Sequence, residues 1–229
     1  MTDREEYRFD PRAPGNRQEI KGQGLLIEGI ADMIRRSYDR IAPRYARDRA
    51  WSAWQTREIN RFMRFLPAGG RVLDLGCGTG RNLKLFHEKG FRVTGIDQSP
   101  QMVRQAQRFI RKGRFYNRSM VSPGFRAESF DGIMSFFAIF HVPHGDQPEV
   151  FRQMHRLLVP GGHFLITMAD YGRLRTYIGP HCGEWMYWSG VSIQESFRRL
   201  RRVGFEILWQ KALGPRDDRN TWIIGRKRG

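Results

Sequence analysis

The chain has 229 residues, of which 40% are apolar, and this is enough to fill the core of one ordinary domain or of two small ones. Its formal net charge of +17 bears on solubility and on anionic partners but not on the fold. The apolar runs are too short to span a bilayer, the first residues lack the hydrophobic segment of a secretion signal, and 2 cysteines are too few for a disulfide framework. We therefore expect a cytoplasmic protein with no membrane partner, and the sequence does not predict its oligomeric state.

The N-terminal part of the chain changes character near residue 23. Residues 1–22 are polar, contain Pro and Gly and show no hydrophobic period, so we expect a flexible arm there. Residues 23–229 are expected to form a single domain. Within it, apolar residues at helical spacing predict helices in the range 28–66, and Pro67 with the glycines that follow ends the second of them.

Beyond residue 70 the hydrophobic pattern alternates between strands and helices. Strands are predicted at 71–76, 91–97, 114–118, about 131–139 and 163–169, with helices at 80–89 and 100–112 between the first three. The last two of these strands are almost continuously apolar, which is typical of parallel strands buried on both faces. FEILWQKA and NTWIIGRK, separated by GPRDD, predict an antiparallel hairpin at the sheet edge. The fold class is therefore α/β, with a mostly parallel sheet and helices on both faces.

Positive charge is concentrated in the middle of the chain. Residues 51–120 carry 14 basic and 4 acidic side chains. Two trios of arginines recur at helical spacing, namely Arg57, Arg61 and Arg64, and Arg104, Arg108 and Arg111. Such stripes are usually solvated faces, and this interpretation is favoured, although they are also a possible surface for nucleic acid.

The sequence VLDLGCGTG at 72–80 places three glycines after a buried strand, where α/β folds bind ligands. Position 81 is Arg rather than the last Gly of a dinucleotide fingerprint, and no Lys-Ser/Thr pair follows as in a phosphate-binding loop. Asp74 would repel a pyrophosphate but suits an ammonium group. Asp97 ends the next strand, where an acid can accept hydrogen bonds from ribose hydroxyls. These features together predict a ligand in which an amino acid is joined to a nucleoside.

Three motifs in order, VLDLGCGTG, GIDQSPQM and LVPGG at 158–162, resemble those of the class I S-adenosylmethionine-dependent methyltransferases. The resemblance extends from about residue 30 to the C-terminus. It implies a Rossmann-like core at residues 70–229, with a seven-stranded sheet in the order 3-2-1-4-5-7-6 and an antiparallel last strand. It also implies an N-terminal helical lid, S-adenosylmethionine as the cofactor and S-adenosylhomocysteine as the product.

The resemblance further implies a set of cofactor-binding residues, which are Tyr38, Tyr45, Asp74, Gly76, Cys77, Gly78, Gly80, Asp97, Gln98, Met102, Ser119, Met120 and Phe136. In this set Asp97 would hold the ribose and Met102 would cover the adenine. Ser119 stands where the family often has an acid facing the adenine amine, so a charge-assisted contact would be replaced by a neutral one. Tyr38 and Tyr45 share one face of SYDRIAPRYA, which resembles a lid helix, and they are expected either to face the cofactor or to pack in the core.

Candidate residues for catalysis and for substrate binding follow the fourth and fifth predicted strands. His141 is either a general base or a structural histidine bonded to the backbone, and Tyr187 is the second candidate catalytic residue. An insertion at about 171–191 is expected to cover the substrate. Within it the side chains of Trp185, Met186 and Trp188 would either wall an apolar pocket or simply cover the sheet. The histidines lack a second cluster at zinc-like spacing, so no metal is expected.

The functional expectation is methyl transfer to an oxygen or nitrogen atom of a small-molecule acceptor. The reaction would be an in-line displacement that depends mainly on proximity and orientation. A methyltransferase acting on tRNA or rRNA through the basic surface is the alternative, and a catalytically inactive binding protein with the same fold is the third possibility.

Overall fold

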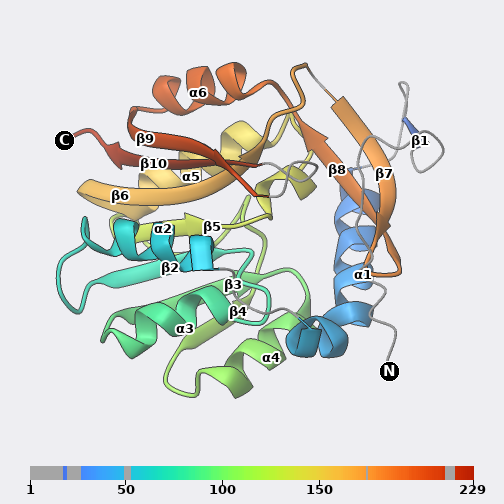
Figure 1. Ribbon diagram of the computed structural model, residues 1–229, viewed down its shortest axis with the longest axis horizontal. Helices are drawn as coiled ribbons and strands as arrows, with labels where there is room; N and C mark the ends of the chain where they lie inside the picture. Colours follow the sequence, from blue (N-terminus) through green and yellow to red (C-terminus); the bar gives the residue numbers. More distant parts are fainter. Residues whose placement is uncertain (1–17, 20–26, 49–52, 174, 215–219) are drawn as a thin grey trace.

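The computed structural model describes residues 18–19, 27–48, 53–173, 175–214 and 220–229 (Figure 1). Its main sheet has seven strands in the order β4-β3-β2-β5-β6-β10-β9. These strands are β2 (Arg71–Leu75), β3 (Arg92–Asp97), β4 (Arg114–Asn117), β5 (Phe130–Ser135), β6 (Leu158–Ala169), β9 (Phe205–Leu213) and β10 (Asn220–Lys227). The first five run parallel, whereas β10 is antiparallel to both of its neighbours, β6 and β9. The predicted order 3-2-1-4-5-7-6 and the predicted antiparallel last strand are therefore confirmed.

Helices cover both faces of this sheet and enclose two apolar cores. The helices are α1 (Ile27–Asp48), α2 (Ala53–Met63), α3 (Arg81–Glu88), α4 (Pro100–Phe109), α5 (Gln147–Leu157) and α6 (Ile193–Arg202), with a short 3₁₀ turn η1 (Ile139–His141). Buried side chains of α2, α3 and α4 pack together against one face, and those of α5 and α6 pack against the other. The order of the elements along the chain thus forms a doubly wound α/β domain.

A second, smaller sheet lies beside α1 (Figure 1). It consists of β1 (Gln18–Glu19), β7 (Arg175–His181) and β8 (Glu184–Gly190) in the order β1-β7-β8. The predicted insertion at about 171–191 contains the antiparallel hairpin of β7 and β8. Within the predicted flexible arm, residues 18–19 pair with β7 as a strand, and the rest of the arm lies outside the described residues.

The carboxyl ends of β2, β3 and β5 meet at one edge of the main sheet, because these strands are parallel and adjacent. The glycine loop, the start of α4 and η1 follow these three strand ends. The start of α4 is fixed by Ser99, whose hydroxyl accepts a hydrogen bond of 3.0 Å from Met102 N, and by Pro100 in the first turn. Within the described residues no helix combines the length and the apolarity needed to cross a membrane.

The packing of β3 under the glycine loop gives a first prediction. A Cβ added at Gly95 would lie 2.8 Å from Cys77 Sγ and 2.8 Å from Phe115 Cδ1. The Gly95→Ala variant should therefore lose about 1–3 kcal/mol of unfolding free energy in urea titrations, because the neighbours have to move. The Gly145→Ala control, at an exposed glycine with no atom within 4 Å of the added Cβ, should change by about 0.5 kcal/mol or less. Equal effects at the two positions would contradict this packing.

Candidate functional site

The glycine loop between β2 and α3 turns tightly at three positions of positive φ, which is +80° at Gly76, +51° at Gly78 and +79° at Gly80. The three positions differ in the space above them. An added Cβ would lie 2.5 Å from Ala138 Cβ at Gly76 and 3.1 Å from Ala106 Cβ at Gly80. No atom of the described residues lies within 4 Å of a Cβ added at Gly78. The loop thus packs closely on the protein at both ends, and the space above Gly78 is free of described side chains.

The backbone N–H groups of the loop are already used inside the protein. Gly76 N and Cys77 N both donate to Ile96 O at 2.9 Å, and Gly80 N donates to Cys77 O at 2.9 Å. Gly78 N donates to Asp97 Oδ2 at 2.9 Å. A phosphate-binding loop needs such groups to point at the ligand. This bonding pattern therefore agrees with the sequence argument against a phosphorylated ligand.

Asp74 is a buried carboxylate next to this loop. Its side chain is fully buried, and neither carboxylate oxygen has a hydrogen-bond partner among the described residues. Burial raises the pKa of Asp74 well above its ordinary value, and the charge of Asp97 raises it further. An unpartnered buried acid is costly, and a cationic group of a ligand would satisfy it. The residue therefore fits a ligand that carries an ammonium group.

Asp97 lies opposite Gly78 at the carboxyl end of β3. Its two oxygens accept hydrogen bonds of 2.9 Å from Gly78 N and from Ser99 N. Burial raises the pKa of Asp97 to about 6, although the two backbone N–H groups act in the opposite direction. Since a carboxylate has about four lone-pair sites, Asp97 keeps the capacity to accept two further hydrogen bonds. The pair of ribose hydroxyls expected from the sequence fits this capacity.

Helix α1 connects the cofactor loops to the small sheet, as expected for a lid. Asp39 Oδ1 accepts hydrogen bonds from Ser99 Oγ at 2.6 Å and from Gln101 N at 3.2 Å, which ties the helix to the start of α4. Arg81, directly after the glycine loop, donates from Nη2 to Ala46 O at 2.7 Å. The lid is thereby attached to both loops that surround Asp97.

The same helix is also bonded to β8. Ser37 Oγ donates to Trp185 O at 2.8 Å, and Arg40 forms an ion pair of 2.7 Å with Glu184. The sequence analysis assigned no role to Asp39, Ser37 or Arg40. A usable signal was present for Asp39, because it directly follows Tyr38 in the segment that resembles a lid helix.

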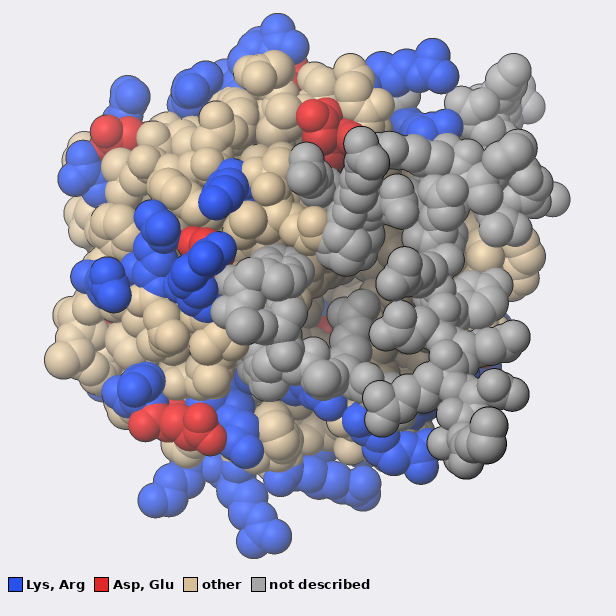
Figure 2. Space-filling model, in the orientation of Figure 1, with Lys and Arg blue, Asp and Glu red and all other residues tan. Residues whose placement is uncertain are grey.

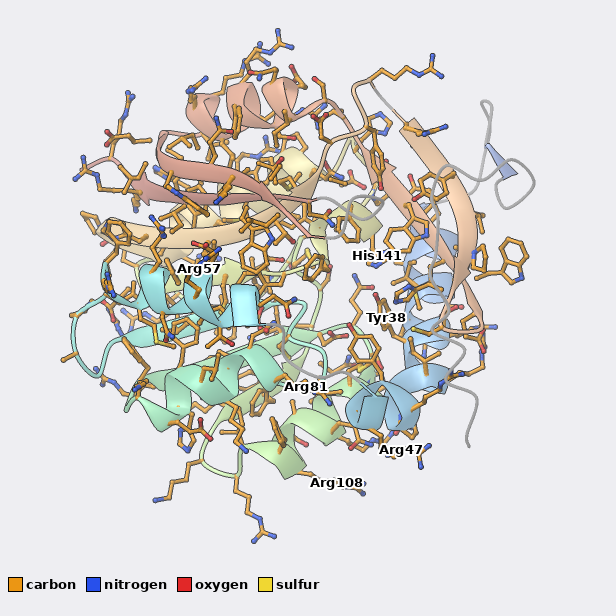
Figure 3. The ribbon with its side chains drawn as sticks, viewed as in Figure 1. Tyr38, Arg47, Arg57, Arg81, Arg108 and His141 are labelled. Carbon is orange, nitrogen blue, oxygen red and sulfur yellow. The ribbon has the colours of Figure 1, made fainter. Side chains whose placement is uncertain are left out.

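Tyr38 and His141 form a direct contact between the lid and η1 (Figure 3). His141 Nδ1 lies 2.7 Å from Tyr187 O, and because a carbonyl only accepts, Nδ1 carries the proton. Nε2 of the neutral ring is then an acceptor, and the Tyr38 hydroxyl donates to it at 2.8 Å. Burial lowers the pKa of His141 to about 4, so the ring is neutral at physiological pH. The bond to the Tyr187 carbonyl agrees with the structural alternative for His141, and its role as a general base stays a prediction.

Aromatic rings rather than charges surround His141. The ring centroid of Trp188 lies 4.6 Å from that of His141, and Phe140 and Tyr177 pack on Trp188 at 5.2 Å and 6.2 Å. Burial lowers the pKa of His141, and the hydrogen bond to the Tyr187 carbonyl acts in the opposite direction. The site thus has an acidic end at Asp74 and Asp97 and an uncharged aromatic end at His141.

Some candidate residues lie elsewhere than expected. The Trp185 side chain is 55% exposed, so it does not pack with buried Met186 and Trp188 as part of an apolar wall. The Tyr187 side chain is buried, and the contact that Tyr187 makes with His141 is through its backbone carbonyl. Phe136 packs in the core against Trp222, with ring centroids 4.9 Å apart. The assigned roles of Trp185 and Tyr187 are therefore not supported by their positions.

The other candidates lie near the loops that contain them. Met120 borders Gly76, since an added Cβ there would lie 3.3 Å from Met120 Cε. Met102 is fully buried and packs with the core of α1, and Ser119 Oγ accepts a hydrogen bond of 3.3 Å from Val121 N. Gln98 is half-buried, and its carbonyl accepts a hydrogen bond of 2.7 Å from Asn117. Their contacts with a cofactor stay predictions.

Tyr45 lies on the same helix as Tyr38, and their ring centroids are 6.3 Å apart at nearly perpendicular planes. Its role as a lid or a core residue stays open. In the described part of the chain no group of three or more His, Cys, Asp or Glu side chains is arranged to hold a metal ion.

Known proteins similar to this chain are methyltransferases. A family described as "Methyltransferase domain" matches residues 72–162. A sterol 24-C-methyltransferase of Aspergillus fumigatus is 29% identical over 177 residues, covering 69% of this chain and 45% of that protein. A 2-methyl-6-phytyl-1,4-hydroquinone methyltransferase of Synechocystis is 33% identical over 112 residues, covering 47% of this chain and 34% of that protein. The chain thus spans less than half the length of these two relatives.

A similar solved structure is the 1,6-didemethyltoxoflavin-N1-methyltransferase of Burkholderia thailandensis, determined with 1,6-didemethyltoxoflavin and S-adenosylhomocysteine bound. The TM-score is 0.76 at 22% identity, and the match covers 93% of this chain and 95% of that one. Residues 72–162, which contain the glycine loop and its two acids, match a methyltransferase domain. The chain as a whole has the fold of the class I S-adenosylmethionine-dependent methyltransferases.

Proposed function

We propose that the protein transfers the methyl group of S-adenosylmethionine to an oxygen or nitrogen atom of a small, flat aromatic molecule whose own O–H or N–H is weakly acidic. The observation that carries this proposal is the neutral Tyr38–His141 pair, which lies among aromatic rings at the uncharged end of the site. The acceptor would lie next to the Tyr38–His141 pair, and the cofactor would lie along the glycine loop.

The residues of the loop fit the cofactor. When bound, S-adenosylmethionine supplies an activated methyl group on a positively charged sulfur. Asp97 would accept the ribose hydroxyls, Asp74 would lie at the amino-acid end, and the open space above Gly78 would admit the ligand next to bare backbone. The role of the protein is then mainly to align two bound molecules, which can contribute about 7–11 kcal/mol in favourable cases.

The uncharged end of the site determines which acceptors are suitable. A base with a pKa of about 4, such as His141, is far too weak for an aliphatic alcohol. The mismatch in pKa with a phenol of pKa about 10 corresponds to about 8 kcal/mol, and it is larger still for an aliphatic hydroxyl, which is a much weaker acid than a phenol. A cationic amine would also lack a carboxylate partner near His141. An acceptor that loses its proton easily, and needs only an oriented hydrogen bond, is therefore favoured.

The names of two similar proteins support this acceptor class. One is named for a hydroquinone, and the other is named for N1 methylation of 1,6-didemethyltoxoflavin, with which it was solved. The buried aromatic cluster of Phe140, Tyr177 and Trp188 gives the surroundings of His141 the apolar character that suits an aromatic acceptor.

An acceptor screen tests the proposal directly. With S-adenosylmethionine labelled at the methyl group, label should appear in phenols, hydroquinones or heteroaromatic N–H compounds, and not in aliphatic alcohols, alkylamines or RNA. Transfer only to RNA would instead support the alternative function. Calorimetry without an acceptor separates the third possibility, because a protein that binds no cofactor would be an inactive scaffold.

The Tyr38–His141 hydrogen bond gives a second prediction. The Tyr38→Phe variant removes only the hydroxyl, and kcat should fall about 10- to 100-fold while the cofactor dissociation constant stays within about threefold. The His141→Gln variant, which keeps an acceptor near the position of Nε2, should lose less activity than His141→Ala. Tyr116→Phe, which removes a hydroxyl from β4 and leaves the Tyr38–His141 pair in place, is the matched control. An unchanged kcat in Tyr38→Phe would show that the Tyr38 hydroxyl does not contribute to catalysis.

A third prediction concerns Asp74. The Asp74→Asn variant should weaken S-adenosylmethionine binding at least tenfold in calorimetric titrations, because the ligand loses its ionic partner. Its unfolding free energy without ligand should be unchanged or up to about 2 kcal/mol higher, since a buried charge is removed.

Asp131→Asn is the matched control for this substitution. Arg71 donates to both Asp131 oxygens at 3.0 Å, and these contacts lower the pKa of Asp131. This variant should therefore be less stable but bind the cofactor normally. Loss of stability in Asp74→Asn without loss of binding would contradict the assigned role.

A fourth prediction concerns pH. The pKa of Asp97 is raised from an ordinary value of 3.8 to about 6, so the ligand-free protein takes up a proton as the pH falls through 6. The free energy of unfolding contributed by this group accordingly falls as the pH rises from about 4 to 6. Cofactor binding favours the ionised form, so the dissociation constant should be about tenfold higher at pH 5 than at pH 7.5. A constant affinity across this range would argue against Asp97 as the ribose ligand.

A further inference from the structure

One helix of the protein presents cations without any acid. Residues 98–127 contain 7 Lys and Arg side chains and no Asp or Glu. Five of these cations lie on α4 and on the turn to β4, and all five are exposed, namely Arg104, Arg108, Arg111, Lys112 and Arg114. We call these five residues the α4 surface. Figure 2 shows Lys and Arg side chains along the lower edge of the molecule, where α4 lies in the same view (Figure 1).

The α4 surface differs from the other arginine-rich helices in its charge balance. None of its five cations has an ion-pair partner among the residues that the structure describes. On α2, in contrast, Arg57 and Arg61 pair with the buried Glu58 at 3.1 Å and 3.0 Å. Two of the three arginines of the first stripe therefore share one buried acid, whereas the second stripe has no acidic partner among the described residues.

On α6, one acid pairs with two of the four arginines. Glu195 lies 2.9 Å from Arg198 and 3.1 Å from Arg199. Concentrated cations that repel one another destabilise the folded state unless they are solvated or bound by an anion. The α4 surface thus differs from the other two helices in having no acidic partner among the described residues.

The shape of the α4 surface suits an anionic group. Arg104, Gln107, Arg108 and Arg111 line a shallow hollow of about 330 Å³. Figure 3 shows the Arg108 side chain pointing away from the body of the protein. The hollow therefore has guanidinium groups and one amide as its donors and no acceptor with a negative charge. Guanidinium groups bind phosphate oxygens through two parallel hydrogen bonds.

An exposed aromatic ring adjoins these cations. Phe109 is 44% exposed, and Lys84 Nζ of α3 lies 4.5 Å from the ring centroid. A solvent-facing ring between cations is the arrangement in which a base stacks while its phosphates are neutralised. Among the described large apolar side chains that are exposed, Phe109 is the one on α4. A helix that binds a bilayer surface usually buries several large apolar side chains in it. A single exposed ring among cations therefore favours a nucleic acid over a membrane as the partner.

We propose that the α4 surface binds the sugar–phosphate backbone of single-stranded RNA, independently of base sequence and apart from the methyl-transfer site. From Arg104 to Arg108 the helix rises about 6 Å, and Arg111, two residues past the end of α4, lengthens the row to a span of about three phosphates of one strand. Lys112 and Arg114 extend the cationic path beyond the end of the helix.

The location of the α4 surface makes it a docking site rather than part of the catalytic site. Helix α4 begins after the carboxyl end of β3 and runs back, so that its C-terminal half and Arg114 lie at the amino edge of the sheet. The glycine loop and His141 lie at the opposite edge. An RNA on the α4 surface would thus localise the enzyme without serving as its acceptor, and this inference does not depend on the proposed acceptor class.

The test is fluorescence anisotropy with a labelled 12-nucleotide oligouridine and the full chain, titrated at several KCl concentrations. The variant combines Arg104→Gln, Arg108→Gln and Arg111→Gln. The matched control combines Arg198→Gln, Arg201→Gln and Arg202→Gln on α6, which removes the same charge from a helix that also carries Glu195. Cofactor affinity and melting temperature are measured for both triple variants, and neither should change by more than a small amount.

The α4 variant should bind the oligonucleotide about tenfold or more weakly at low salt, and its plot of log affinity against log salt should be shallower by about two units. The α6 variant should lose less than about threefold. Equal losses in both variants would overturn the proposal, because only net charge would then matter. Failure of the unmodified protein to bind oligouridine would also overturn it. Retention on phosphatidylserine vesicles that depends on the α4 arginines, with RNA binding unaffected by them, would assign the surface to membranes instead.

Discussion

The structure depends on two carboxylates, Asp74 and Asp97, held at the end of a buried sheet without a cationic side chain to pair with among the described residues. Burial raises the pKa of both, because keeping two ionised carboxylates out of water is unfavourable. This unfavourable burial lies at the point where the cofactor is expected. The tight glycine loop makes this possible, because its own N–H groups bond within the protein and no described side chain occupies the space above Gly78. A basic protein thereby keeps a local site for a cationic ligand.

The acceptor end of the site is uncharged, in contrast to the acidic cofactor end, because of the residues that surround it. His141 lies in an aromatic cluster, and its tautomer is fixed by a backbone carbonyl. The two ends of the site are therefore electrostatically separate, although Tyr38 on the lid connects them. Such a division suits a reaction between a cationic donor and a neutral acceptor, in which the protein contributes orientation more than acid–base strength.

Much of this could be predicted from the sequence, because local patterns determine it. Continuous apolar runs, helix caps such as Ser99 and the glycine spacing specify the order of elements and the cofactor loop. Contacts between distant segments could not be predicted in the same way. Tyr38 and His141 are 103 residues apart, and the exposure of Trp185 beside buried Trp188 depends on where the chain turns within the β7–β8 hairpin. The sequence WMYW is apolar and aromatic throughout and does not alternate between apolar and polar residues. The pattern therefore does not indicate which of its side chains are buried and which are exposed.

The attachments of α1 have a kinetic consequence. Its hydrogen bonds reach Ser99, Gln101, Arg81 and Trp185, which belong to elements on both sides of the site. The helix therefore cannot swing aside by releasing one contact, and several bonds have to break together before a spent cofactor departs. In an enzyme built this way the residence time of the product, rather than the speed of bond making, sets the upper limit on turnover.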